Sequence, residues 1–432
     1  MKVLVCDDNA GLGREIADAV AEGTAGEVEV SVLVEGALTE ELTKLFERVR
    51  ACLDNPGAFA SARDLAFDAA DLAILDNNLT HLGIKGARLT AEAIAGYLRA
   101  FTAVPYLVSL NKNPEIDFDL RYLVGDYETR ADIALNTDHL SNGALWTRNR
   151  ADAEDGFLPW YWPELRAAPA RRRQQIAFVR DHLKEPVLPA LGIPTDQDSL
   201  GFLSRHAKGA LSPDAETDGA DDGGDGIPIG SVTFQDVFVA RSRSLPTAEE
   251  REKVGAGADA GNGALVDLVA RVVAADIDLW FRRDVVAPQE MLIDVPHLLM
   301  RMPFLLGAKA RDLAEWNKAI DEGNPPFGID PTLFQSHIAK ARHQHDIWVP
   351  STAFRWPDLK ANDELNALFF SSKQEDWADV VFCEDLSAFL ERSPKAGPSP
   401  VEFSAEFAGS WARRHVAKLE DVHYAPLSQF AV

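Results

Sequence analysis

The chain has 432 residues, of which 46% are hydrophobic and 26% charged, as is typical of a globular protein of about two or three domains. Its three cysteines, at positions 6, 52 and 383, are too few and too scattered for a disulfide framework or a zinc finger. The formal net charge of −25 disfavours nonspecific binding to nucleic acids and to anionic lipids.

The first 150 residues alternate short apolar runs of the strand type with amphipathic segments of the helix type. The predicted strands cover residues 2–6, 28–34, 71–75, 106–110 and 131–135. The predicted helices between them cover residues 9–22, 39–53 and 89–101. Such alternation predicts an α/β fold in which helices cover both faces of a mainly parallel sheet.

A connector of a different composition follows. The aromatic run at residues 159–163 and the basic stretch at 168–188 predict a helix with aromatic anchors that pack on the first domain. Arg171, Arg172 and Arg173 within this stretch favour a solvated helix face, and contact with a phosphate or an acidic partner is the alternative.

An acidic segment marks the clearest boundary of the chain. Residues 212–226 contain six carboxylates and almost nothing apolar, which predicts a flexible linker. We therefore divide the chain into a first domain (1–148), a helical connector (149–210), an acidic flexible linker (211–228) and a C-terminal region (229–432). In the last region the pattern predicts a strand at 231–240, a helix at 265–281 and a strand at 379–383. These elements fit a mixed α+β or α/β region.

Acidic side chains follow two of the predicted strands of the first domain. Asp7 and Asp8 come directly after the first strand, and Asp76 ends the third. Because the carboxyl ends of parallel strands meet at the crevice where ligands bind, these carboxylates are expected to converge. Carboxylates so close together repel one another unless a cation neutralises them, and Mg²⁺ prefers oxygen ligands. Asp8 could instead cap the following helix, but this would leave Asp7 and Asp76 unexplained.

In this order, with Ser109 near the end of the fourth strand, these motifs resemble the receiver domain of bacterial response regulators over residues 1–148. The resemblance implies a flavodoxin-like sheet of five parallel strands in the order 2-1-3-4-5. It implies that Asp7 and Asp8 bind Mg²⁺ with the backbone carbonyl of Asn78, that Asp76 is the phosphoacceptor, and that Ser109 is the switch hydroxyl. A carboxylate nucleophile beside a divalent cation is consistent with phosphoryl transfer.

The sequence departs from the receiver pattern at the end of the fifth strand, where the family has a lysine. Asn136 or Thr137 stands at this place, and Lys112, just after Ser109, is a candidate substitute for the switch lysine. The segment between the second and third strands is also longer than the pattern needs. These departures keep open a pseudo-receiver that retains the fold without phosphotransfer.

A second metal site is an alternative in the C-terminal region. His337, His343 and His345 fall within nine residues, and Glu384 follows a predicted strand, so these four side chains are candidate ligands. The polar run around His343 and His345, however, is typical of a surface.

Three functions follow from these observations. The first is a cytoplasmic signalling protein that receives a phosphoryl group at Asp76 from a histidine kinase or other protein partner and controls its C-terminal region. The second is a pseudo-receiver that acts as a protein-interaction platform. The third is a metal-dependent hydrolase or nuclease with its site in the C-terminal region, around His343, His345 and Glu384. No window approaches the roughly 20 apolar residues of a membrane span, so no membrane partner is expected. The net negative charge of the chain argues against a nucleic-acid partner. A homodimer is a further possibility that the sequence does not decide.

Overall fold

The computed structural model of the chain describes residues 1–54, 64–79, 82, 90–110, 117–119, 130–211, 227–241, 263–321, 328–349, 352–372, 377–407 and 410–425. The acidic segment at 212–226 and Lys112 lie outside these residues. Within the described residues, no helix has both the length and the apolar character needed to cross a bilayer.

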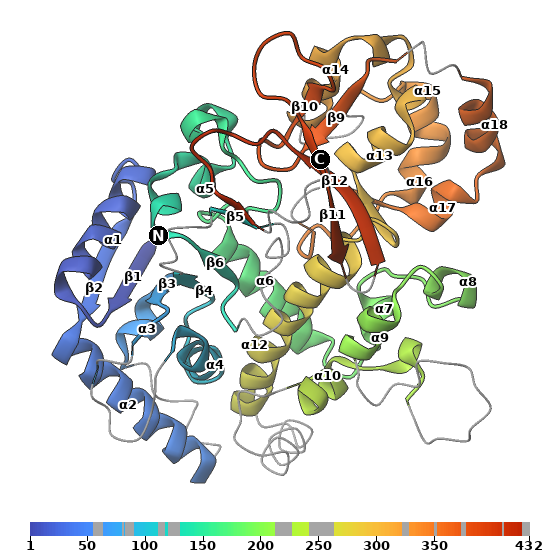
Figure 1. The fold of residues 1–432 in the computed structure, drawn as a ribbon. Coiled ribbons are helices and arrows are strands. Elements are labelled where there is room, and N and C mark those ends of the chain that lie inside the picture. The colour runs from blue at the N-terminus through green and yellow to red at the C-terminus, as the bar shows by residue number, and fades with distance from the viewer. Residues whose placement is uncertain are drawn as a thin grey trace.

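Five parallel strands form the N-terminal sheet, in the order β2-β1-β3-β4-β6 (Figure 1). They are β1 (Lys2–Asp7), β2 (Glu29–Val34), β3 (Leu72–Asp76), β4 (Tyr106–Leu110) and β6 (Ile133–Leu135). Because β6 is the fifth strand of this sheet along the chain, the order is the predicted 2-1-3-4-5 arrangement. The parallel sheet expected from the alternating pattern, and the flavodoxin-like strand order that the resemblance implied, are therefore confirmed.

Alternate residues of β1 point to opposite faces of the sheet, as the pleat requires. Val3 and Val5 pack on the face covered by α1 (Ala10–Gly23) and α5 (Gly143–Thr147). Leu4 and Cys6 pack on the other face, together with residues of α2 (Glu35–Asp54) and α4 (Ala91–Phe101). The short helix α3 (Ala66–Ala69) precedes β3. Strands buried on both faces need unbroken apolar runs, which is why the sequence pattern located them.

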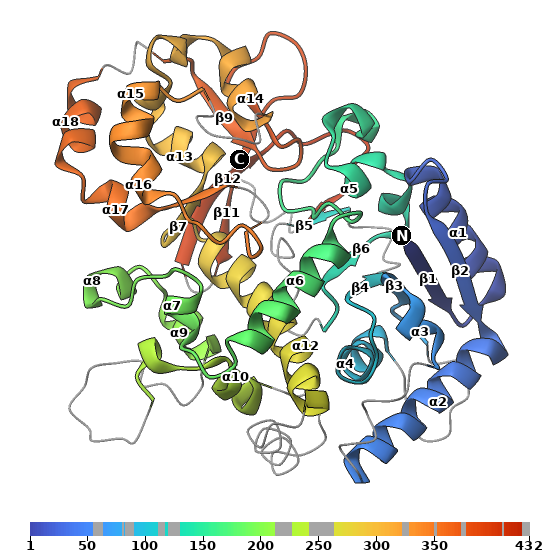
Figure 2. The same ribbon diagram turned by 180° about the vertical axis from the view of Figure 1, so that it is seen from behind.

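Helices from beyond the first domain extend the second face of the sheet. The helix α12 (Gly263–Trp280) packs against α4, and α6 (Ala168–Asp181) packs against α12 and β4 (Figures 1 and 2). One continuous apolar cluster contains residues from β1, α4, α6 and α12. The N-terminal sheet thus shares a core with the connector and with part of the C-terminal region.

The prediction of a strand at residues 231–240 is wrong, because this segment contains most of the helix α10 (Phe234–Arg241). Thr233 and Asp236 begin it as a capping box, in which the N–H of Asp236 donates to the Thr233 hydroxyl and the N–H of Thr233 donates to the Asp236 carboxylate. Phe234, Val237 and Phe238 are buried, and their spacing places them on one helical face.

The three consecutive arginines of α6 lie in different environments, so the solvated face predicted for them is wrong in part. Arg173 is exposed and pairs with Asp71. Arg172 is 1% exposed and pairs with Asp132 and Asp278. The helical period separates neighbouring side chains by about 100°, which accounts for the contrast.

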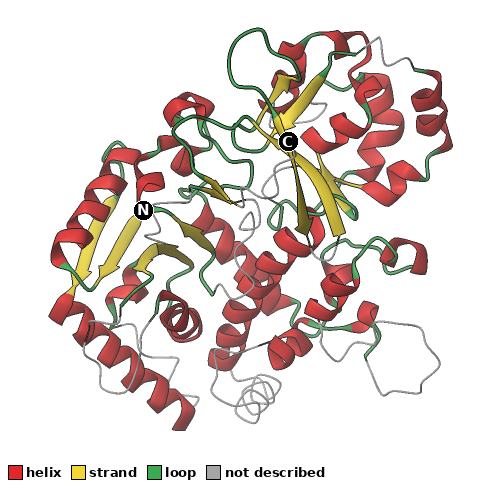
Figure 3. Cartoon of the chain, viewed as in Figure 1, coloured by secondary structure: helices red, strands yellow, loops and turns green. Residues whose placement is uncertain are grey.

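A second apolar core lies in the C-terminal region and includes residues of a mixed sheet, whose strands Figure 3 shows. Its four strands have the order β10-β9-β12-β11, and only β9 and β12 are parallel. They are β9 (Val380–Cys383), β10 (Ala388–Glu391), β11 (Val401–Phe407) and β12 (Ser410–Val416). A separate antiparallel pair joins β7 (Leu292–Asp294) and β8 (Ala353–Arg355).

The remaining helices are α7 (Val187–Ala190), α8 (Gln197–Leu200), α9 (Arg205–Leu211), α13 (Val295–Arg301), α14 (Leu313–Asp321), α15 (Pro331–Leu333), α16 (Ala339–Ala341), α17 (Trp356–Lys360) and α18 (Asp363–Ser371). Near its C-terminal end the chain returns to the first domain, where β13 (Tyr424–Ala425) pairs in parallel with β5 (Phe118–Asp119). The two halves are therefore joined by main-chain hydrogen bonds as well as by apolar contacts.

Candidate metal centre at the sheet edge

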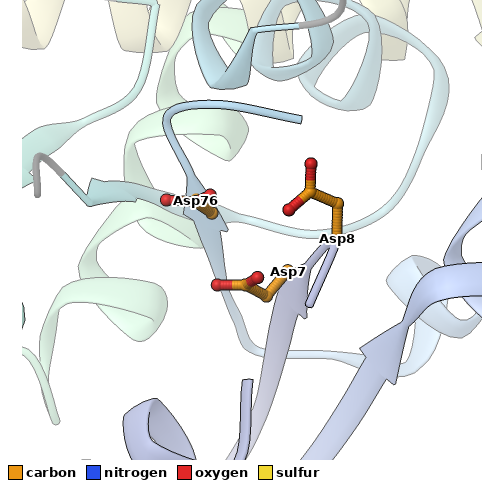
Figure 4. Close-up of side chains that lie close together, drawn as sticks. All are labelled: Asp7, Asp8 and Asp76. Atoms are coloured by element: carbon orange, nitrogen blue, oxygen red, sulfur yellow. The ribbon is translucent and has the colours of Figure 1, made fainter. Parts of the chain in front are cut away.

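Three carboxylates converge at the carboxyl edge of the N-terminal sheet (Figure 4). Asp7 ends β1, Asp8 follows it, and Asp76 ends the neighbouring strand β3. One oxygen from each carboxylate lies within 4.8 Å of the other two. Asp7 is 0% and Asp76 3% exposed, whereas Asp8 is half-buried. The predicted convergence of these three side chains is confirmed.

Strand register and a tight turn create this arrangement. Cys6 of β1 is paired with Leu75 of β3, so the next residue of each strand, Asp7 and Asp76, reaches the same edge. The N–H of Asn9 donates to Oδ1 of Asp7 at 2.8 Å, and Oδ1 of Asn9 accepts from the first N–H groups of α1. Asn9 is thus the helix cap. The alternative role of Asp8 as the cap is wrong, and its carboxylate lies beside the other two (Figure 4).

The donor set fits a hard divalent cation. Exposed acidic clusters are common on protein surfaces, but two of these three carboxylates are buried. Like charges at short range in a poorly solvated place raise the energy of the folded state unless a cation offsets them. All-carboxylate oxygen donors favour Mg²⁺ or a similar ion over softer metals. Asp7, Asp8 and Asp76 would therefore hold such an ion.

Asn78 lies two residues beyond Asp76. It forms an isolated antiparallel bridge with Thr90, the residue that caps α4. This bridge ties the segment after β3 to the start of α4. The expected role of Asn78 as a further metal ligand stays a prediction.

Ser109 is buried on β4, where it is paired with Leu75 of β3. It forms a side-chain hydrogen bond with Glu92, in the first turn of α4. Burial raises the pKa of the Glu92 carboxyl, although the N–H groups of Arg130 and Ala131 and the Ser109 hydroxyl oppose that rise. Sequence reasoning missed Glu92. Its position in the first turn of a helix that starts at the carboxyl edge of the sheet was the available signal.

Asn136 is one of the two residues, with Thr137, expected where the receiver family has its lysine, and its side chain makes structural hydrogen bonds. Its Oδ1 accepts from the N–H of Thr137 at 2.8 Å, and its Nδ2 donates to Oδ1 of Asp117 at 3.1 Å. The end of the fifth strand, among the described residues, therefore supplies an amide and no cation. Lys112, the predicted substitute, lies outside the described part of the chain.

The predicted second metal site is not assembled. His337 contacts Asn362 and Glu364, whereas Glu384 contacts His297 and Arg414. In the described ranges of the chain, Asp7, Asp8 and Asp76 make up the one group of three or more side chains that could share a metal.

His343 and His345 are neighbours in space, with ring centroids 5.6 Å apart. His343 is buried, so the surface position expected from its polar sequence is wrong. Burial, and then the neighbouring His345 and Arg355, lower the pKa of His343 to about 4. The His343 ring is therefore neutral at physiological pH and packs against Phe281.

Comparison with known proteins assigns no family to this chain. No protein-family model matches the chain, and no curated protein or solved structure matches it. The function proposed for this chain accordingly rests on the arrangement of its own residues.

Proposed function

We propose that the chain is a signalling protein whose N-terminal unit binds Mg²⁺ at Asp7, Asp8 and Asp76 and accepts a phosphoryl group on Asp76. The proposal is carried by one observation: the three carboxylates meet within 4.8 Å at the carboxyl edge of a parallel sheet in the 2-1-3-4-5 order. That edge is where ligands bind in folds of this type. A cytoplasmic histidine kinase or another phosphodonor is the partner that this chemistry requires.

Each residue of the site has a distinct part in this reaction. A carboxylate oxygen of Asp76 forms a bond to phosphorus, and the donor leaves with the electrons of the bond that breaks. Bound Mg²⁺ would supply positive charge to offset the negative charge of the phosphoryl oxygens. Asp7 and Asp8 would hold the ion. The hydroxyl of Ser109, on the next strand, would turn from Glu92 toward the new group.

A route from this site to the rest of the protein runs through α4. The helix follows the segment after Asp76, is capped by Thr90 and packs against α12. Arg271 of α12 also donates to the carbonyl of Ala100 in α4. A change at the start of α4 would therefore alter its packing against α12 and, through it, the C-terminal region.

A second function, a pseudo-receiver that acts as a protein-interaction platform, is favoured by two observations. Glu92 places a carboxyl group against Ser109, where an incoming phosphoryl group would be repelled. Asn136 supplies no positive charge where the family has a lysine. Under this proposal the cation site stabilises the domain and no phosphoryl group is accepted.

Magnesium binding tests the part that both proposals share. A ligand that binds only the folded state stabilises it by RT ln(1 + [L]/Kd), or about 2.7 kcal/mol at a 100-fold excess over Kd. Millimolar Mg²⁺ is therefore expected to raise the melting temperature of the full chain. Asp8→Ala should abolish the rise, whereas Asp18→Asn, at an exposed position on α1, should keep it. Absence of any rise in the parent protein would overturn both functions.

Phosphorylation separates the two functions. Incubation with acetyl phosphate and Mg²⁺ should add one phosphoryl group, detected as a mass increase of the intact protein. Asp76→Asn should remove this adduct, and Asp18→Asn should not. Magnesium stabilisation without an adduct from acetyl phosphate or from a histidine kinase would favour the platform.

A further inference from the structure

A pocket of about 180 Å³ lies at the junction of the connector and the C-terminal region. Its lining comes from residues 148–171, from residues 282–294, from Glu384 just after β9 and from Arg414 within β12. It shares no lining residue with the aspartate cluster. The pocket is therefore a separate feature of the molecule, and the proposed phosphoryl chemistry does not use it.

Among the residues that the structure describes, two arginines of this pocket have no carboxylate partner. Arg148 donates from Nη1 to the carbonyl of Pro159 at 2.8 Å, and its guanidinium lies 5.4 Å from the ring centroid of Trp160. Within the described residues, no carboxylate oxygen lies within 4.0 Å of a guanidinium nitrogen of Arg148 or Arg171. Arg414 of the same pocket differs from these two arginines because it is paired: its Nη1 lies 2.6 Å from Oε1 of Glu384.

The two unpaired charges also affect each other. Burial lowers the pKa of Arg148 to about 10, and the positive charges of Arg150 and Arg171 act in the same direction. Glu164 opposes them from the pocket wall without forming an ion pair. Two cations that share a partly desolvated pocket raise the energy of the folded state unless an anion enters.

Aromatic side chains form the wall beside these charges. Trp160, Tyr161 and Trp162 all line the pocket. Two of them are held in place: Nε1 of Trp160 donates to Oδ2 of Asp294 at 2.8 Å, and the Trp162 ring packs edge to face on Phe157. Rigid aromatic walls with a few convergent polar groups are typical of sites that bind small molecules.

The geometry points to a binding site for a small organic anion, in which Arg148 and Arg171 hold a phosphate or carboxylate group and the aromatic wall contacts a flat apolar body. Guanidinium groups match both oxyanions in shape and charge. Of the three consecutive arginines, Arg172 and Arg173 are already paired with aspartates, so Arg171 is the one that remains for a ligand. A bound anion would link the connector to the C-terminal region.

Phenyl phosphate and benzoate are suitable probes, because each joins one oxyanion to one aromatic ring. In buffers of equal ionic strength made up with chloride, at least one of them should raise the melting temperature of the full chain and give a measurable Kd by calorimetry. Tighter binding of phenyl phosphate would identify a phosphate ligand, and tighter binding of benzoate a carboxylate ligand.

Variants of the arginine run test the location of the site. Arg171→Gln should weaken binding at least about tenfold, as expected when a hydrogen bond to a charged group is lost. Arg148→Gln should do the same. Arg171 makes no ion pair within the described structure, so its variant should fold even where Arg148→Gln does not. Arg173→Gln, on the same helix but outside the pocket, and Asp8→Ala, at the metal centre, should leave the Kd unchanged.

Three results would overturn the proposal. The first is that neither probe binds the parent protein. The second is that Arg171→Gln binds the probe as tightly as the parent protein does. The third is that Arg171→Gln and Arg173→Gln weaken probe binding equally. None of these results depends on whether Asp76 accepts a phosphoryl group.

Discussion

A guanidinium nitrogen of Arg172 lies 2.7 Å from a carboxylate oxygen of Asp132, and both side chains are almost completely buried. Arg172 belongs to α6 in the connector, and Asp132 directly precedes β6 of the N-terminal sheet. Asp278 of α12 lies 3.0 Å from the same guanidinium nitrogen. One buried charge thus joins three parts of the chain, and separating them would leave it without partners.

Replacing Arg172 with glutamine is therefore expected to lower the free energy of unfolding by about 3 kcal/mol, because breaking a buried ion pair leaves uncompensated charge. Arg173→Gln is the matched control. Its side chain is 53% exposed and its ion pair with Asp71 lies at the surface, so a loss of at most about 1 kcal/mol is expected. Urea unfolding of the full chain measures both values. Equal losses for the two variants would contradict the role given to Arg172.

His297 lies between two buried carboxylates and predicts a pH dependence. Its Nδ1 lies 2.5 Å from Oδ1 of Asp294, and its Nε2 lies 2.9 Å from Oε1 of Glu384. Burial and Arg414 act to lower the pKa of His297, but Asp294 and Glu384 outweigh them and raise it. A raised histidine pKa stabilises the fold fully below the unfolded value of 6.5 and loses that contribution as the pH rises through the folded value.

His297→Gln should therefore flatten the decline in the free energy of unfolding on the alkaline side of pH 6.5. The opposite sign applies to Asp294. Burial opposes ionisation, but His297 and Trp160 bring its pKa to about 2, so its contribution is present above 3.8 and is lost as the pH falls toward 2. Urea unfolding at a series of pH values measures the free energy of unfolding on both the acidic and the alkaline side. His206→Gln, at an exposed histidine, should keep the parent profile; a parent-like alkaline limb in His297→Gln would refute the assignment.

The hydroxyl of Tyr424 donates to Oδ2 of Asp385 at 2.5 Å, and the N–H groups of Ala417 and Lys418 donate to the same carboxylate. Burial raises the pKa of Asp385, and these hydrogen bonds oppose the rise. Tyr424→Phe should lower the free energy of unfolding by about 2 kcal/mol, because a hydrogen bond to a charged group is lost.

The loss in Tyr424→Phe should grow as the pH rises through the raised pKa of Asp385, since only the ionised form of this carboxyl needs the donor. Tyr97→Phe is a suitable control, because Tyr97 packs edge to face on Phe46 and its ring is retained. It should change stability by at most about 0.5 kcal/mol. A pH-independent loss in Tyr424→Phe would indicate a packing effect.

Gly23 ends α1 at a close contact with the segment that follows β6. A Cβ atom at this position would lie 2.1 Å from the carbonyl oxygen of Leu140 and 2.7 Å from Nε1 of Trp146. It would separate two groups that are hydrogen-bonded at 2.8 Å. Gly23→Ala should therefore lower the free energy of unfolding by about 3 kcal/mol. Gly36→Ala in α2, where a Cβ meets nothing within 4 Å, should leave it unchanged or raise it by about 0.5 kcal/mol. Thermal unfolding that ranks the two variants alike would contradict this packing.

The sequence by itself determined the N-terminal sheet and its acidic edge. A central strand of a parallel sheet buries both faces, so it must be an unbroken apolar run, and the aspartates that end β1 and β3 are next to such runs in the chain. Local pattern was less decisive for α10. Its capping box and its apolar spacing were both present, but its β-branched and aromatic residues also suit a strand.

Only the tertiary structure decided which polar groups meet. Glu92 and Ser109, Arg172 and Asp132, and Arg148 and Arg171 each come together because helices and strands distant in the chain pack on one another. Whether a charged side chain is solvated, paired or held against a like charge depends on the residues that surround it in space. The local period of a sequence fixes which face of an element is apolar, but not which partner that element will find.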